Sequence, residues 1–317
     1  MSSIMPRDNF NFKLFLKKMG PARFAQKVLF PDQIHKVNDR PIFLTGIYRS
    51  GTSWVGKIIS FADSLICYRE PFNPSVVQRM PQQYYYISPE KDNLFYADFT
   101  EKLLKGHLVG ADFDYTTNNN YFNFRHSRYL IKDPTAAFLT EWLSNKYSFE
   151  TIILLRHPAG FVSSILKLNW DFDLSIFLNQ KNLMDEHLHH FKFIINKYNY
   201  KGMTIEKGAV IWGVIYYFLN KLINNEGYYY IKYEDICKNP YDKFKEIFDK
   251  FSLMWNERVE HEIKLSTESA STFSRNTFCV SRDTSKMDKI WMNRLTVNQI
   301  KTIKRITSEF DIPYYRD

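Results

Sequence analysis

The stretch that most constrains the fold is Thr45 to Trp54, TGIYRSGTSW, which lies between a short apolar run and a segment of helical periodicity. The apolar run, residues 42–44, is typical of a buried parallel strand. Four residues separate Gly46 from Gly51, which is the spacing of a phosphate-binding P-loop. Such a loop turns backbone N–H groups towards an anion at a helix N-terminus. The stretch therefore predicts an anion site between a strand and a helix.

This P-loop pattern departs from the nucleoside-triphosphatase form at one position. Thr52 stands where those enzymes carry the lysine that holds the β- and γ-phosphates, and the basic side chain of the loop is Arg49. The sequence RSGTSW resembles the first motif of sulfotransferases that use 3′-phosphoadenosine 5′-phosphosulfate (PAPS), in the form typical of their carbohydrate-type and bacterial branches. The resemblance implies a catalytic role for Arg49. It also implies cofactor-binding residues, which are Arg49, Ser50, Gly51, Thr52, Ser53 and Trp54.

A second motif follows the clearest buried strand of the sequence, residues 151–155. This strand leads into Arg156, and Ser164 comes eight positions later on an expected helix. The arrangement resembles the second sulfotransferase signature, which implies that both side chains bind the 3′-phosphate of PAPS. The chemistry suits them, because a guanidinium presents a planar fork to phosphate oxygens and a hydroxyl adds a donor.

Two more expected strands end in charged residues followed by proline, at Glu70 and at Lys132-Asp133. The Glu-Pro pair resembles that of carbohydrate sulfotransferases, which implies that Glu70 is the general base. A surface ion pair is the alternative. The Lys-Asp-Pro sequence also resembles the family, and it implies that Lys132 and Asp133 contact the substrate, with Asp133 as a second acid/base candidate. A structural ion pair between the motifs is the alternative there.

The C-terminal half continues the resemblance. A last expected strand, residues 228–233, runs into Glu234, and a closing helix is expected over 295–310. Between them a Ser/Thr-rich stretch carries Arg282, which the resemblance implies is a further cofactor contact. The irregular residues 106–127 are expected to form a loop that contacts the acceptor.

Composition limits the classes of partner and the compartment. The formal charge of +9 suits an anionic ligand, and without a nucleic-acid-binding motif we expect no nucleic acid partner. The sparse cysteines, and the lack of an apolar leader or a membrane-spanning stretch, predict a cytoplasmic protein. A short basic amphipathic segment near the start is expected to pack on the domain, with contact to an anionic membrane as the alternative. The charged segment 170–203 is expected to be helical. Its histidines at 187, 189 and 190 lack the one-turn spacing of a helical zinc site, so we expect no metal.

Together these features predict an α/β fold with a three-layer, P-loop-type parallel sheet and helices on both faces. We expect one sulfotransferase domain over residues 1–317, with a helical extension over 1–40 and the binding core over 41–317. The expected function is sulfuryl transfer from PAPS to an acceptor hydroxyl or amine, on a carbohydrate. A small-molecule or lipid acceptor is one alternative. A P-loop kinase and a non-catalytic anion-binding protein are alternatives from other classes.

Overall fold

The computed structural model describes residues 40–63, 65–105, 128–223, 225–268 and 289–315. Its strands are β1 (Ile42–Gly46), β2 (Leu65–Arg69), β3 (Arg128–Lys132), β4 (Glu150–Leu155) and β5 (Tyr228–Lys232). β1, β4 and β5 begin within about one residue of their expected positions, and β2 and β3 end just before Glu70 and Asp133, as expected. The expected N-terminal extension, the loop over 106–127 and Arg282 lie outside the described residues.

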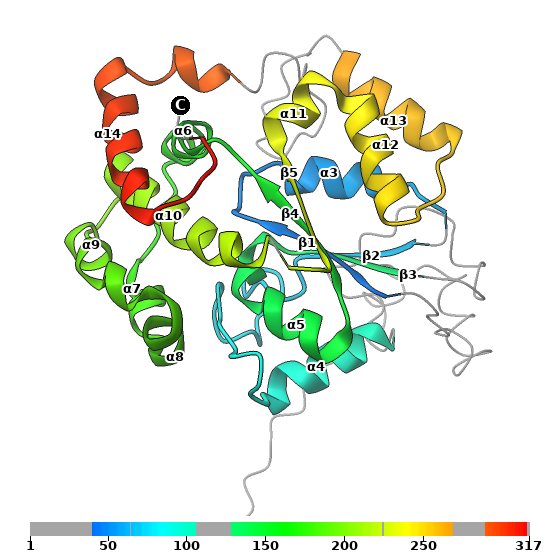
Figure 1. Cartoon of the computed structure of the whole chain (residues 1–317), viewed down its shortest axis with the longest axis horizontal. Helices are drawn as coiled ribbons and strands as arrows, with labels where there is room; N and C mark the ends of the chain where they lie inside the picture. Colours follow the sequence, from blue (N-terminus) through cyan, green and yellow to red (C-terminus); the bar gives the residue numbers. More distant parts are fainter. Residues whose placement is uncertain (1–39, 64, 106–127, 224, 269–288, 316–317) are drawn as a thin grey trace, which may run out of the picture.

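The strands form one parallel sheet in the order β2-β3-β1-β4-β5 (Figure 1). The chain moves from β1 to one side of the sheet for β2 and β3, and then crosses to the other side for β4 and β5. The direction of winding therefore reverses around β1. Loops that leave the carboxyl ends of parallel strands at such a point form the usual ligand site of open α/β sheets.

Helices cover both faces of the sheet, as predicted. The α-helices are α3 (Thr52–Ile59), α4 (Leu94–Leu104), α5 (Thr140–Tyr147), α6 (Pro158–Leu168), α7 (Ser175–Leu178), α8 (Lys181–Leu183), α9 (Lys192–Lys197), α10 (Ile205–Leu222), α11 (Tyr233–Lys238), α12 (Pro240–Lys250), α13 (Glu257–Glu268) and α14 (Val297–Thr307). The short 3-10 and π turns are η2 (Pro134–Leu139), η3 (Met184–Leu188), η4 (His189–Phe191), η6 (Ile290–Asn293) and η7 (Ser308–Phe310).

Alternate residues of the buried strands supply the two faces with apolar side chains. Ile42 and Leu44 of β1 belong to an apolar cluster with residues of α3, α11 and α12, whereas Phe43 belongs to a cluster with residues of α4 and α5. Figure 1 shows these two sets of helices on opposite faces of the sheet. A third apolar cluster lies under α6, α10 and α14. Gly213 of α10 lets Phe310 approach closely, because a Cβ there would lie 2.2 Å from the ring.

The segment 170–203, expected to be helical, is divided into the short pieces α7, α8, η3, η4 and α9. A residue with positive φ lies near each end of this segment: Asn169 with φ 50° and Gly202 with φ 87°. A second difference lies at Tyr233, which was expected to end a strand and instead begins α11.

Candidate active site

The candidate residues meet at one edge of the sheet, because each follows the carboxyl end of a parallel strand. The P-loop follows β1, Glu70 follows β2, Asp133 follows β3, and Arg156 follows β4. Tyr233 and Glu234 follow β5 at the same edge. The topology thus brings together segments that are far apart in the sequence.

Both glycines of the P-loop are required by close approach and by backbone conformation. Gly46 has φ 148°, and a Cβ at this residue would lie 2.4 Å from the carbonyl oxygen of Leu154 on β4. Gly51 has φ 100°, and a Cβ there would lie 2.4 Å from the ring of Tyr233. The sequence spacing of the two glycines therefore reflects two separate contacts with β4 and α11.

The backbone amides of the loop divide into two groups. The N–H of Ser50 donates to the carbonyl of Ile47 at 3.1 Å, so this amide closes the turn. The N–H groups of Trp54 and Val55 both donate hydrogen bonds to the Gly51 carbonyl oxygen, with N···O distances of 3.0 and 3.1 Å. The amides between them begin α3, where an α-helix leaves its first N–H groups without an intrahelical partner. The Oγ of Ser50 is buried and has no hydrogen-bond partner among the described residues.

Trp54, expected to contact the cofactor, lies largely inside the core. Its indole N–H donates to Ser266 Oγ at 3.0 Å, and its ring packs edge-on against Tyr233 and Phe244 at 6.1 and 5.4 Å. Only 6% of the residue is exposed. In this structure Trp54 joins α3 to α11, α12 and α13.

Arg49 connects the first motif to the second. Its backbone is left-handed, with φ 65°, and its Nε donates to Ser164 Oγ on α6 at 3.2 Å. The guanidinium carbon also lies 5.7 Å from the centre of the Trp170 ring, in a cation–π arrangement. The structure thus places two side chains from different motifs in direct contact.

Arg156 packs against the same loop from β4. Its guanidinium donates to the carbonyl of Arg49 and lies 4.6 Å from the centre of the Tyr233 ring. The indole N–H of Trp212 fixes its backbone carbonyl at 2.8 Å. The Nε of Arg156 is buried without a hydrogen-bond partner in the described part of the chain, and so is the Oγ of Ser163. A buried guanidinium donor is costly to leave unsatisfied, so this one fits an anionic ligand.

Glu70 forms an ion pair with Lys132 across the ends of β2 and β3. Lys132 Nζ lies 2.5 Å from Glu70 Oε1 and 3.4 Å from Ser53 Oγ. The other carboxylate oxygen of Glu70 accepts from the Asn73 amide at 2.8 Å. Burial is the largest influence on Glu70 and opposes its charged form. The charge and hydrogen bond of Lys132, with the Asn73 hydrogen bond and the charge of Arg69, together outweigh burial and lower the pKa of this carboxyl. Glu70 is therefore ionised at neutral pH, as a proton acceptor must be.

Asp133 has the hydrogen bonds of a structural residue. Its side chain is fully buried and caps η2, accepting from the backbone N–H and the hydroxyl of Thr135 at 2.9 and 2.7 Å. The second oxygen accepts from the N–H of Phe72 at 2.8 Å. Burial, with the nearby charge of Glu70, raises the pKa of Asp133 to about 7. These contacts tie η2 to the turn that carries Glu70.

A group of residues around Glu234 was not identified from the sequence. Glu234 accepts from the His157 backbone N–H at 2.9 Å and from the Tyr315 hydroxyl at 2.5 Å. The ring of His157 stacks on Trp291, with centroids 4.5 Å apart and 8° between the planes. Two segments near the C-terminal end of the chain therefore pack beside Arg156. The acidic Tyr-Glu-Asp sequence was a visible signal, but the aromatic partners lie too far away in sequence to be associated with it.

Within the described ranges, no group of three or more His, Cys, Asp and Glu side chains is arranged to hold a metal ion. None of the helices in those ranges is long and apolar enough to cross a bilayer.

The sequence matches the model of the sulfotransferase domain over residues 39–310. The chain belongs to the sulfotransferase-domain family. This match spans most of the sulfotransferase chain, including the P-loop, the segment from Arg156 to Ser164 and the sheet that carries them. A search of curated proteins gives no significant match.

Solved structures similar to this sulfotransferase show low sequence identity. Mouse sulfotransferase SULT7A1 complexed with PAP is 14% identical, with a TM-score of 0.47 over 86% of this chain and 84% of that one. The sulfotransferase domain from the curacin biosynthetic pathway is 17% identical, with a TM-score of 0.46 over 86% and 98%. STF1 from Mycobacterium tuberculosis H37Rv is 14% identical, with a TM-score of 0.42 over 94% and 85%.

Proposed function

We propose that this sulfotransferase transfers the sulfuryl group of PAPS to an acceptor hydroxyl or amine and releases adenosine 3′,5′-bisphosphate. The observation that carries the proposal is the meeting of Arg49, Ser164 and Arg156 at the P-loop, with the buried Nε of Arg156 unsatisfied by the described residues. Two basic side chains, a hydroxyl and a helix N-terminus there suit a ligand that carries two separate anionic groups.

In the proposed reaction the acceptor oxygen or nitrogen forms a bond to sulfur while the bond between sulfur and the phosphate oxygen breaks. The acceptor proton passes to Glu70, and the released oxygen keeps the bonding electrons as a negative charge. Arg49, the amides of residues 51–53 and the hydroxyl of Ser50 stabilise that charge. Little covalent chemistry is required of the protein, so positioning and charge stabilisation supply the rate.

The remaining candidates receive the following roles. Arg156 and Ser164 bind the 3′-phosphate. Lys132, which lies between Glu70 and Ser53, contacts the transferring group. For Asp133 we propose a structural role, because its carboxylate oxygens are occupied by the N–H groups and hydroxyl that they hold in place. Trp54 and Arg282 remain proposed cofactor contacts from the resemblance.

For the acceptor we propose a carbohydrate, with a small molecule or lipid as the alternative. Trp170 is 38% exposed beside Arg49 and offers a ring face suited to stack on a sugar or another flat group, with the ring of Tyr48 packed against it. We retain a cytoplasmic location as a proposal, supported by the sparse cysteines of the sequence.

Calorimetric titration with adenosine 3′,5′-bisphosphate, 5′-AMP, and ATP with magnesium tests the cofactor. We expect the bisphosphate to bind more tightly than both others and without metal. Preference for ATP with magnesium would overturn the proposal in favour of a kinase. Once the bisphosphate binds, a screen of acceptors with labelled PAPS separates carbohydrate, small-molecule and lipid acceptors. Binding with no transfer to any acceptor would instead support an anion-binding protein.

A further inference from the structure

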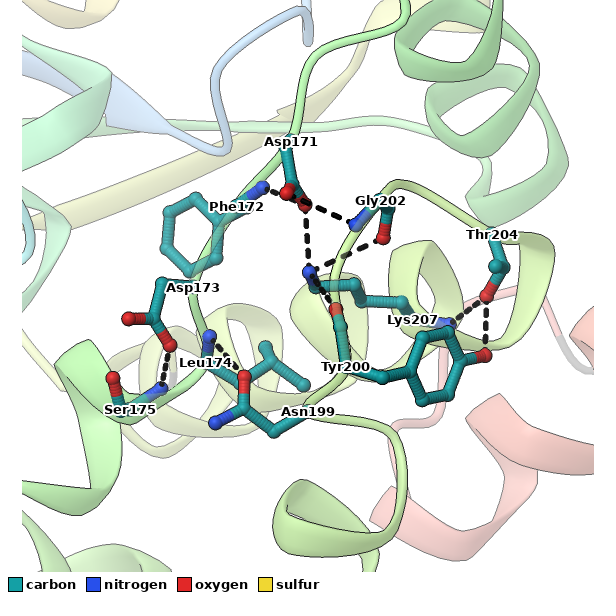
Figure 2. Close-up of polar contacts among 10 residues, drawn as sticks. All are labelled: Asp171, Phe172, Asp173, Leu174, Ser175, Asn199, Tyr200, Gly202, Thr204 and Lys207. Atoms are coloured by element: carbon teal, nitrogen blue, oxygen red, sulfur yellow. Dashed lines mark hydrogen bonds and ion pairs between the residues drawn. The ribbon is translucent and has the colours of Figure 1, made fainter.

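Lys207, in the first turn of α10, is a buried lysine that the proposed reaction does not use. Its side chain is 1% exposed, and its ammonium faces three acceptors (Figure 2). These are Asp171 Oδ1 at 2.7 Å, the Tyr200 carbonyl at 2.7 Å and the Gly202 carbonyl at 3.3 Å. An ammonium has three N–H donors, so this one is fully satisfied. Such complete pairing is required for a cation to be buried.

Asp171 holds the other end of this network. It accepts from Lys207, from the N–H of Gly202 at 3.0 Å and from the N–H of Phe172 at 2.8 Å. The nearby amide oxygen of Asn199 also accepts from the N–H of Leu174 at 2.9 Å (Figure 2). The network therefore joins the segment that follows α6 to the turn before α10. Those two segments are about 30 residues apart in the sequence.

Two aromatic residues flank Asp171, and both contact the P-loop. Phe172 is buried, and its ring stacks on Tyr48 with centroids 6.2 Å apart. Trp170 lies 6.1 Å from the same tyrosine ring and 5.7 Å from the guanidinium of Arg49. Trp170 is 38% exposed, so burial alone fixes its ring less firmly than that of Phe172. Trp170 directly precedes Asp171 in the chain, so the hydrogen bonds of Asp171 hold the backbone next to this indole.

We propose that the Asp171–Lys207 ion pair is a positioning clamp that holds Trp170 beside Arg49, so that the exposed indole face forms a wall of the acceptor site. The Lys207 side chain is buried, and the Asp171 side chain is 49% exposed. The pair therefore anchors the surface segment that carries Trp170 to the buried start of α10. Buried ion pairs contribute little net stability compared with apolar residues of the same size, but they fix one arrangement of the segments they join. The acceptor such a wall selects presents a flat face, as sugar and aromatic rings do.

Fluorine NMR of protein labelled with 5-fluorotryptophan tests the clamp without any assay of activity. The chain has six tryptophans, and Trp170→Phe identifies the signal of Trp170 by its loss. In Lys207→Met, whose side chain has similar length and no charge, we expect the Trp170 signal to move or broaden while distant indole signals keep their positions. Asp171→Asn keeps the shape of the side chain and should produce a smaller change of the same kind.

Lys181→Met is the matched control, because Lys181 forms an exposed pair with Asp185 and its side chain is 86% accessible. It should leave the Trp170 signal unchanged. An unchanged Trp170 signal in folded Lys207→Met would overturn the clamp. If Lys207→Met does not fold, Asp171→Asn decides the matter, because the amide keeps an oxygen acceptor for the buried ammonium while it removes the negative charge. An unchanged Trp170 signal in folded Asp171→Asn would then overturn the clamp.

The acceptor wall rests on the proposed function and has a separate measurement. In Lys207→Met and in Trp170→Ala we expect kcat/KM for the acceptor to fall about ten- to a hundredfold, since small misplacements near reacting groups are costly. Affinity for adenosine 3′,5′-bisphosphate should stay within about twofold. If Lys207→Met displaces the Trp170 signal but keeps a normal kcat/KM for the acceptor, Trp170 is not part of the acceptor site. The role of the ion pair in positioning Trp170 would still hold. If the unmodified protein transfers no sulfuryl group, the proposed function fails, and the NMR result still decides the clamp.

Discussion

Arg49 donates its Nε–H to the Oγ of Ser164, and this 3.2 Å contact joins two motifs that lie 115 residues apart in the sequence. The P-loop and α6 are therefore coupled directly through side chains, in addition to their shared sheet. Arg156 strengthens the coupling by donating to the carbonyl of the same arginine. The side chains of each motif are therefore positioned in part by contacts with the other motif.

Replacing Ser164 with alanine should weaken binding of adenosine 3′,5′-bisphosphate about tenfold, because a hydrogen bond to a charged group is lost. Binding of 5′-AMP, which lacks the 3′-phosphate, should change much less. Calorimetry with both nucleotides measures the difference. Ser163→Ala is the matched control on the same helix, and its affinities should equal those of the unmodified protein. If Ser163→Ala weakens binding and Ser164→Ala does not, Ser163 and not Ser164 binds the 3′-phosphate.

Arg49→Ala should lower turnover about a hundredfold or more if its guanidinium stabilises the charge on the released oxygen. Single-turnover transfer from labelled PAPS measures this step. Lys57→Ala gives a comparison on α3, because Lys57 pairs with Glu262 outside the loop. Turnover that is unchanged in Arg49→Ala would remove this side chain from the reaction.

Lys132→Met should move the acid limb of the pH–rate profile to higher pH. With Lys132 present, the pKa of Glu70 is held below its ordinary value. Once the ammonium is gone, burial remains and raises the pKa, so activity should be lost at a higher pH as the solution is acidified. The measurement is kcat/KM against pH, with Lys102→Met on the exposed face of α4 as control. If the acid limb of the profile lies at the same pH in Lys132→Met as in Lys102→Met, Glu70 is not the base.

His157 should make the protein less stable as the pH falls. Burial and the charge of Arg156 lower the pKa of His157 from its usual 6.5 to about 4. The unfolded chain therefore binds the proton more readily, so stability declines below pH 6.5 and levels off near pH 4. Between pH 7 and pH 5 we expect a loss of about 2 kcal/mol in the free energy of unfolding.

Urea denaturation at pH 7 and pH 5 measures this loss, and His157→Asn provides the comparison. Asparagine can still cap α6, where His157 Nδ1 accepts from the N–H of Ala159, but it does not titrate. The part of the pH dependence due to His157 should disappear in this variant. Equal pH dependence in both proteins would contradict the assignment.

The positions of the strands were predictable because parallel strands buried on both faces appear as short apolar runs. Those runs end directly at Gly46, Glu70, Asp133 and Arg156, so the sequence also indicated which residues share an edge of the sheet. Which side chains touch was not predictable. The contacts of Arg49 with Ser164 and Trp170 depend on the placement of α6 and of the segment after it.

Other features were hidden for particular physical reasons. Tyr233 continues the aromatic run of β5, so the start of α11 had no signal in residue type. Lys207 resembles any charged residue in the first turn of a helix, and its burial follows from acceptors on other segments. The segment 170–203 has helical composition, but its tertiary contacts divide it into short pieces.

Arg49 and Glu70 both adopt left-handed backbone conformations, with φ 65° and 55°, a geometry that costs an L-amino acid about 1–2 kcal/mol relative to glycine. The two side chains proposed to act on the reacting atoms therefore occupy the positions where their own backbone opposes them. Glycine at either position would relieve this cost, but it would lose the contact of Arg49 with Ser164 or the ion pair of Glu70 with the buried Lys132. Each left-handed residue is therefore held in place by a side-chain contact that glycine could not make.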